Sequence, residues 1–171
     1  MGLLLERFSE VHFSDYLTLV GNIHVMAMIT ERAVPYDEAY HDFKLILDDN
    51  ARYSDLGYYR ITDDQNGNFI GLAKLVSVAD QPKTAELGYM LLPEYWGLGI
   101  ASQIATLLIE QAHRNSEISS LIAIIDPANL ASKKILLNNH FTTLEFKDFD
   151  GLPGRNSASC SMKIGLSEFG D

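Results

Sequence analysis

Two glycines separated by one residue, Gly97 and Gly99, lie between a strand-like segment and an amphipathic helix-like segment. Residues 84–92 alternate as in a β-strand, and apolar residues recur at helical spacing from Ile100 to about residue 115. Glycine permits a tight turn and a close approach of a ligand to the backbone, and the first N–H groups of a helix have no partner within it. The helix dipole adds about half a positive charge at this end. The segment therefore predicts a main-chain cradle for a pyrophosphate, and the alternative is a tight strand-to-helix connection without a ligand.

Two common phosphate-binding motifs do not fit these glycines. No Gly-Lys-Ser/Thr follows them, which excludes a P-loop. The third glycine of the dinucleotide fingerprint is missing, and no second βαβ half follows. A different phosphate-containing ligand is therefore needed.

The glycine segment resembles motif A of the GNAT superfamily, the acetyl-CoA-dependent N-acetyltransferases, whose pattern is Gln/Arg-x-x-Gly-x-Gly/Ala. Gly97 and Gly99 match this pattern, whereas Glu94 occupies the Gln/Arg position. The form Pro-Glu-Tyr-Trp-Gly-x-Gly-Ile-Ala is similar to the branch of ribosomal-protein N-terminal acetyltransferases and their small-molecule relatives, in which the first motif position is often not basic. The resemblance implies acetyl-CoA as co-substrate, with its pyrophosphate on the glycine loop and its pantetheine arm on the main chain before it. The residues implied in coenzyme binding are Met90, Leu91, Leu92, Trp96, Gly97, Leu98, Gly99, Ile100 and Ala101.

Length and composition indicate one globular domain over residues 1–171, with 47% hydrophobic and 21% charged residues. The net charge of −10 disfavours nucleic acid and favours a cationic partner such as an amine. Cys160 is the only cysteine, so an intrachain disulfide and a cysteine-based zinc site are excluded. No apolar stretch is long enough to span a membrane. We therefore expect a cytoplasmic protein that binds neither nucleic acid nor a membrane, and the resemblance leaves a homodimer open.

The order of predicted elements defines the fold class. Strands are predicted at residues 3–8, 57–61, 69–78, 85–92, 121–125, 141–149 and 158–164. Helices are predicted after a Ser14-Asp15 cap, from Pro35 to about residue 50, from residue 100 to about 115, and from Asn129 to 137. We expect turns at residues 63–68 and 80–83 and a loop at residues 150–154. This order predicts a mixed α/β, GNAT-like fold, with a mostly antiparallel sheet of six or seven strands, helices on both faces and a splayed parallel strand pair.

Acetyl transfer to an amine requires a neutral amine, a polarised carbonyl and a proton for the departing thiolate. Glu86 lies in the strand before the glycine loop, and in the resembled family a glutamate at the corresponding place takes the amine proton directly or through water. The alternative is a strand glutamate that faces solvent.

A second group of candidates follows the strand at residues 121–125. Asn129 and Ser132 match the family signature Asn-x-x-Ser-x-x-x-Leu-x-x-x-Gly-Phe, with His140 in place of the final glycine. The resemblance implies that both contact the coenzyme. The alternatives are that Asn129 only caps the helix and that Ser132 is a solvated residue of its first turn.

Many relatives protonate the thiolate with a tyrosine at the position that Leu136 occupies here. In the ribosomal-protein branch a serine at the position of Ser132 can serve instead, which makes Ser132 the candidate acid. A hydroxyl is a poor acid and a thiolate can leave with solvent help, so the alternative role is hydrogen bonding alone.

His140 is explained by a cap shifted onto Asn138 or Asn139. The histidine spacings predict no metal site. The rival to an acetyltransferase is a catalytically silent acyl-CoA sensor or interaction module.

Overall fold

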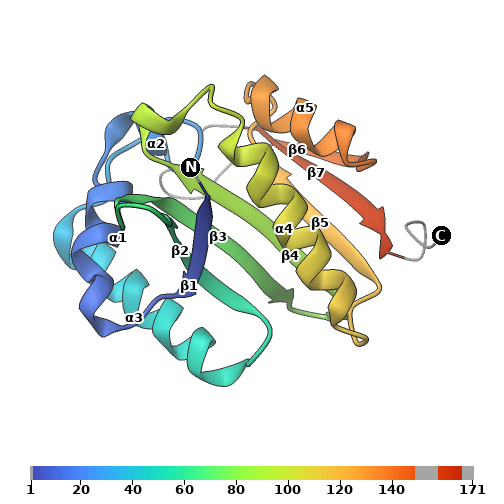
Figure 1. Ribbon diagram of the computed structural model, residues 1–171. Coiled ribbons are helices and arrows are strands. Elements are labelled where there is room, and N and C mark those ends of the chain that lie inside the picture. The colour runs from blue at the N-terminus through green and yellow to red at the C-terminus, as the bar shows by residue number, and fades with distance from the viewer. Residues whose placement is uncertain (1, 149–157, 167–171) are drawn as a thin grey trace.

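The computed structural model describes residues 2–148 and 158–166. The predicted loop at residues 150–154 and the end of the strand predicted to reach residue 149 lie outside these residues. Within them, seven strands form one sheet (Figure 1), namely β1 (Leu3–Arg7), β2 (Gly57–Asp63), β3 (Phe69–Val78), β4 (Gln81–Leu91), β5 (Ser120–Ile125), β6 (Thr142–Asp148) and β7 (Ala158–Gly165). The helices are α1 (Phe13–Val20), α2 (Ile23–Met26), α3 (Tyr36–Arg52), α4 (Ile100–Arg114) and α5 (Leu130–Asn138).

The sheet has the strand order β1-β2-β3-β4-β5-β7-β6 and contains one parallel pair, β4 with β5. That pairing joins only Thr84–Glu86 to Ser120–Ile122, although both strands continue further. At the paired end, Thr84 Oγ1 and Ser120 Oγ share a buried hydrogen bond of 2.9 Å. The two strands are therefore joined at one end and diverge at the other, which confirms the predicted fold class with its splayed parallel pair.

Each face of the sheet supports its own hydrophobic cluster. Successive side chains of β3 point to opposite faces, so that Leu72 packs with helices α1 to α3 whereas Ala73 and Leu75 pack with α4. In Figure 1, α4 crosses one face in front of β4 and β5, while α1 and α3 lie at the β1–β2 side of the sheet. The apolar periodicity of α4 explains its position, because Ile104 and Leu108 are fully buried on one helical face.

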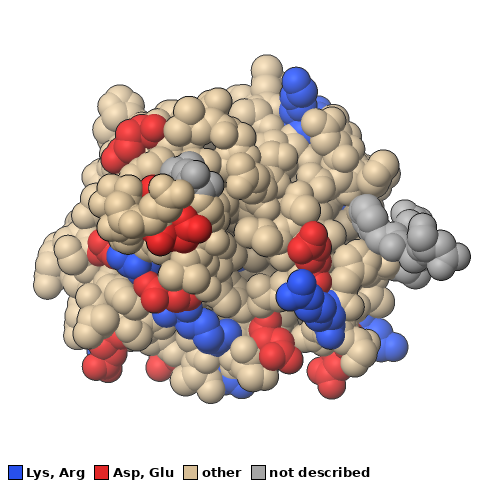
Figure 2. Space-filling model, viewed as in Figure 1, with Lys and Arg blue, Asp and Glu red and all other residues tan. Residues whose placement is uncertain are grey.

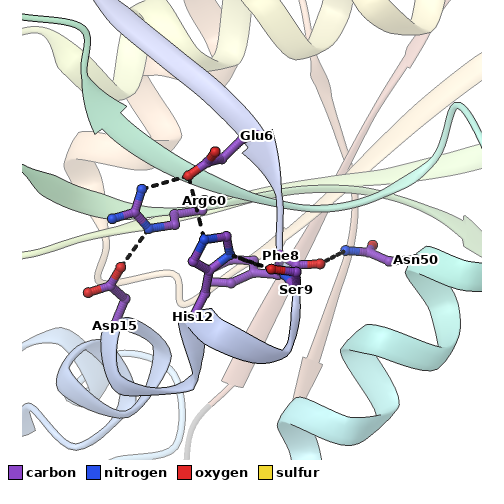
Figure 3. A network of polar contacts seen from close by, with 7 residues as sticks. All are labelled: Glu6, Phe8, Ser9, His12, Asp15, Asn50 and Arg60. Atoms are coloured by element: carbon purple, nitrogen blue, oxygen red, sulfur yellow. Dashed lines mark hydrogen bonds and ion pairs between the residues drawn. The ribbon is translucent and has the colours of Figure 1, made fainter. Parts of the chain in front are cut away.

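Polar contacts fix the N-terminal helices to the sheet (Figure 3). Arg60 of β2 donates to Glu6 of β1 over 2.7 Å and to Asp15 of α1 over 2.5 Å. Asn50 of α3 acts where β1 ends beside β2. Its amide nitrogen donates to the carbonyls of Phe8 and Tyr58, and its side-chain oxygen accepts from the Tyr58 N–H over 2.8 Å. Asn50 thus takes the place of a strand residue and satisfies backbone groups that the ladder leaves open.

Two predicted boundaries are wrong. Helix α1 begins at Phe13, so that Ser14 and Asp15 lie in its first turn and do not cap it; a 3₁₀ turn over Glu10–His12 leads into the helix. Strand β4 begins at Gln81, because the hairpin from β3 turns at Ala79 and Asp80 and not over residues 80–83. Asp80 adopts a positive φ of 64°, which aspartate tolerates better than most residues.

The shifted cap predicted for α5 is also wrong. His140 itself adopts the left-handed conformation, with φ of 64°, whereas Asn139 has φ of −97°. The His140 N–H donates to the carbonyl of Leu137 and the Phe141 N–H to that of Leu136, which is the Schellman arrangement. Leu136 and Phe141 are both buried and provide the hydrophobic contact of this motif. The helix ends here in spite of the histidine, because these bonds and contacts favour the left-handed residue.

Acidic and basic side chains are interspersed on the face shown in Figure 2. Among the described residues, no helix has the length and apolar character that crossing a membrane requires.

Asn50→Ala should lower the free energy of unfolding by about 2–3 kcal/mol, because the Phe8 carbonyl and the Tyr58 N–H lose their partner and the Tyr58 carbonyl keeps only the Phe8 N–H. Urea unfolding measures this change. Asn138→Ala, at an exposed position near the end of α5, is the matched control and should change stability little. A loss in Asn50→Ala that is no larger than in the control would contradict the role given to Asn50.

His140→Gly should raise the free energy of unfolding by about 1 kcal/mol, because glycine adopts the left-handed conformation without the steric cost that histidine incurs. Asn138→Gly is the control, since it places glycine at a helical position and should be slightly destabilising. Thermal and urea unfolding of both variants test the assignment. Equal destabilisation by the two substitutions would refute it.

Candidate active site

A cavity of about 440 Å³ opens where β4 and β5 diverge. Its walls come from β3, β4, β5, β7, α5 and the segment after α2. Four predicted site residues line it, namely Glu86, Met90, Asn129 and Ser132. The glycine loop, Leu91 and Leu92 do not line it but follow β4 directly. The structure therefore brings the two predicted catalytic residues into one cavity, next to the strand that leads into the predicted cradle.

A second cavity, of about 380 Å³, lies beside Arg7 and Arg114 and contains none of the predicted site residues. The Arg7 guanidinium donates there to four backbone carbonyls, those of Asn50, Tyr53, Ser54 and Leu56. Because these bonds engage both terminal guanidinium nitrogens in holding the segment between α3 and β2, we assign this cavity to the architecture and the β4–β5 cavity to the chemistry.

The main chain of β4 presents alternate residues to the gap. The Leu92 N–H donates to the carbonyl of Ile70 over 2.9 Å, so alternation directs the backbone groups of Leu92 and Met90 towards β3. The backbone groups of Leu91 and Tyr89 then face the gap. Of the residues implied for the pantetheine arm, Leu92 thus has its N–H bonded to β3, and Met90 contributes its side chain to the cavity wall.

The glycine loop has the conformation and the open space that an anion requires. Gly97 and Gly99 adopt left-handed φ values of 73° and 77°, and a Cβ at either position would meet no atom within 4 Å. The first bond of α4 runs from the Gln103 N–H to the Gly99 carbonyl, which leaves the N–H groups of residues 100–102 without a helical partner. The Trp96 indole N–H donates to the Leu91 carbonyl over 2.8 Å and fixes the loop to the end of β4. A pyrophosphate fits such a cradle.

Glu86 is partly buried and ion-paired. Its carboxylate forms an ion pair of 2.5 Å with the Lys74 ammonium of β3, and both side chains are only partly exposed. Lys74 therefore competes with any ammonium that approaches Glu86. Burial, followed by the charges of Asp49 and Glu86, raises the pKa of Tyr58, so that its hydroxyl near Glu86 stays protonated.

Asn129 caps α5, and Ser132 lies in the first turn of the same helix. The Asn129 side-chain oxygen accepts a hydrogen bond of 3.1 Å from the Ser132 N–H. The cap predicted as an alternative is thus present, but it engages only the oxygen. No described residue pairs with the amide nitrogen, so capping and contact with a ligand in the cavity are compatible.

Among the cavity residues that sequence reasoning missed are Lys74 and Tyr89. Lys74 interrupts the apolar strand β3, which was a usable signal, but its pairing with Glu86 depends on strand register. Tyr89 follows the alternation of Leu87 and Leu91, which places its side chain on the α4 face. Its hydroxyl is buried and lacks a hydrogen-bond partner among the described residues.

No group of three or more histidine, cysteine or acidic side chains that could hold a metal ion occurs among residues 2–148 and 158–166.

Comparisons with known proteins agree with this geometry. A family model described as an acetyltransferase (GNAT) domain matches residues 2–142. The probable N-acetyltransferase YjcK of Bacillus subtilis is 27% identical over 131 residues, which cover 77% of this chain and 63% of that protein. The chain thus spans less than two thirds of this curated relative.

Solved structures give the same fold. A spermidine N-acetyltransferase from Vibrio cholerae, in complex with CoA and spermine, has a TM-score of 0.80 at 19% identity and coverage of 96% of each chain. RimL, a ribosomal L7/L12 alpha-N-protein acetyltransferase in complex with CoA, has a TM-score of 0.79 at 21% identity and coverage of 95% of this chain and 93% of that one. The chain therefore belongs to the acetyltransferase (GNAT) family, and its fold is that of an N-acetyltransferase domain.

Proposed function

We propose that this protein transfers the acetyl group of acetyl-CoA to a primary amine by direct attack in the β4–β5 cavity. The observation that carries the proposal is the end of the parallel pairing at Glu86 and Ile122, beyond which the cavity gathers Glu86, Asn129 and Ser132. Family membership supports the same reaction. A bound acetyl-CoA would supply an activated thioester, and the residues described above have to bind it and manage the protons.

Binding of the coenzyme is assigned to three sets of groups. The open N–H groups at the start of α4 would hold the pyrophosphate. The main-chain groups of Tyr89 and Leu91, which face the gap, replace Met90 and Leu92 as partners of the pantetheine arm and as donors to the thioester carbonyl. The amide nitrogen of Asn129 would provide a further donor from α5.

Deprotonation of the acceptor is assigned to Glu86. An acceptor amine arrives mostly as an ammonium ion, which the carboxylate attracts and from which it takes a proton directly or through water. The Lys74 ammonium is paired with one oxygen of the same carboxylate, so it competes with an acceptor for Glu86. This competition makes Lys74 a determinant of acceptor binding.

The acceptor class is a primary amine, either a small molecule or a protein N-terminus. The spermidine and ribosomal-protein acetyltransferases named above represent these two kinds of acceptor. The net charge of −10 attracts a cationic acceptor of either kind.

Two observations favour a second candidate function, an acyl-CoA-binding module without turnover. The Glu86 carboxylate is already ion-paired, and buried Leu136 stands where many relatives have a tyrosine. Incubation with acetyl-CoA and a panel of amines and peptides distinguishes the two functions. Coenzyme binding without acceptor-dependent release of thiol would support the module and overturn the proposed reaction.

Glu86→Gln should lower turnover by about a hundredfold at neutral pH, because the amide cannot accept the amine proton. Most of the loss should be recovered at high pH, where the amine deprotonates itself. Release of free thiol measures the rates. Lys74→Met is the comparison variant, because it removes the ion pair but keeps the carboxylate. It should change the acceptor KM strongly and the pH dependence of turnover little. A pH–rate profile of Glu86→Gln parallel to that of the wild type would contradict the role of Glu86 as base.

Gly99→Val should weaken CoA binding about tenfold or more, because valine strains the left-handed position and fills the open space of the cradle. Gly67→Val is a matched control, since Gly67 has a φ of 73° and equally open surroundings but lies in the β2–β3 turn. Calorimetric titration with CoA, together with thermal unfolding of both variants, separates loss of binding from backbone strain. Equal CoA affinities in the two variants would mean that the cradle is wrongly placed.

A further inference from the structure

Tyr89 occupies the α4 face of β4, at the level where this strand has left β5. It pairs with Ala73 of β3, and its ring packs partly buried against the cluster that contains Leu87 and Leu91. Its side chain also lines the β4–β5 cavity, together with Ser132 and Leu136 of α5. The ring is therefore held in the core and forms part of the cavity wall.

The Tyr89 hydroxyl is the one buried side-chain oxygen or nitrogen without a hydrogen-bond partner among the described residues. A buried hydroxyl without a partner is destabilising, and phenylalanine would fill the same space without this cost. Ser132 lies near enough to lower the pKa of Tyr89, but the two hydroxyls do not meet the geometry of a hydrogen bond. Because Tyr89 also lines the cavity, a ligand bound there can supply the missing partner.

The positions of the polar groups on the two faces of the sheet indicate which ligand atom the Tyr89 hydroxyl would contact. Glu86 and Lys74 belong to the other face, because they alternate with Leu87 and Tyr89 along β4 and with Ala73 and Leu75 along β3. The acyl carbon of the thioester has to meet an amine at Glu86. The thioester therefore passes through the gap, and its carbonyl lies at the main chain of Tyr89 and Leu91. Its sulfur then lies on the α5 side, where the Tyr89 hydroxyl is.

We propose that Tyr89 is the proton donor to the departing sulfur of CoA. In this step the amine nitrogen forms a bond to the acyl carbon, the C–S bond breaks, and its electron pair stays on sulfur, which takes the phenolic proton. The nitrogen gives its first proton to Glu86 before attack and its second proton to water after attack, and solvent returns a proton to the phenolate. The assignment rests on the proposed acetyl transfer.

The protonation state of Tyr89 suits this role. Burial raises its pKa and the Ser132 hydroxyl lowers it, so the phenol is protonated over the working pH range. The charged groups that line the cavity are Lys74, Glu86 and Asp126. A phenol, with an ordinary pKa of about 10, is closer to a thiol at about 8.5 than an aliphatic hydroxyl is, which makes Tyr89 a better acid than Ser132.

A binding experiment tests the contact with sulfur without relying on turnover. CoA and desulfo-CoA, which lacks the sulfur, are titrated into the wild type and into Tyr89→Phe. The wild type should prefer CoA by about fivefold, as one hydrogen bond provides, and Tyr89→Phe should bind both equally. Tyr59→Phe is the control, because its hydroxyl bonds to Asp55 and Gln111 away from the cavity, and it should keep the preference. A preference that persists in Tyr89→Phe overturns the proposal.

Kinetics test the proton transfer. Tyr89→Phe should lower kcat by about a hundredfold with little change in the KM for acetyl-CoA. A fluorinated tyrosine at position 89, whose phenol is more acidic, should shift the alkaline limb of the kcat profile to lower pH, which a structural role would not do. An unshifted limb refutes Tyr89 as the acid. If the wild type releases no thiol with any amine, the proposed acetyl transfer fails, and the CoA preference still decides the contact with sulfur.

Discussion

The functional architecture depends on the point at which β4 and β5 stop pairing. Three residues of each strand form the parallel ladder, and the buried Thr84–Ser120 hydrogen bond reinforces that end. Beyond Glu86 the strands remain paired with their other neighbours, β3 and β7. Backbone groups that face the gap therefore have no strand partner, although such groups are normally satisfied in folded proteins. A polar ligand that inserts between the strands supplies these bonds, and so the gap is suited to a pantetheine-like chain with amide groups.

Much of the fold could be predicted because its strands carry strong local patterns. The limits of β3 agree with the prediction, since apolar and β-branched residues fill residues 69–78. Local patterns do not determine which of several polar residues begins a helix or turns a hairpin. Ser14-Asp15 was a plausible cap, but the 3₁₀ turn before it set the start of α1. His140 adopts the left-handed conformation, which histidine disfavours, because the bonds and contacts of Leu136 and Phe141 determine where the helix ends.

The candidate site could be predicted only as far as short motifs reach. The glycine loop, Glu86, Asn129 and Ser132 each lie within a recognisable segment, but which of them face one cavity depends on how distant strands align. Register brings Lys74 to Glu86, and alternation directs the Tyr89 side chain to α5 and the Leu92 N–H to β3. These contacts depend on the neighbouring strands and helix, so a single segment of sequence does not reveal them.

The division of the core between the two faces of the sheet has a consequence for how such a protein changes. Helices α1 to α3 are packed on one cluster and α4 on the other, with the strands as a shared wall. Substitutions among the N-terminal helices can reshape the proposed acceptor side while the cradle at the start of α4 keeps its shape. Because that cradle consists of backbone groups, it also tolerates exchange of most side chains around it. One coenzyme site can in this way be inherited unchanged by proteins that acetylate very different amines.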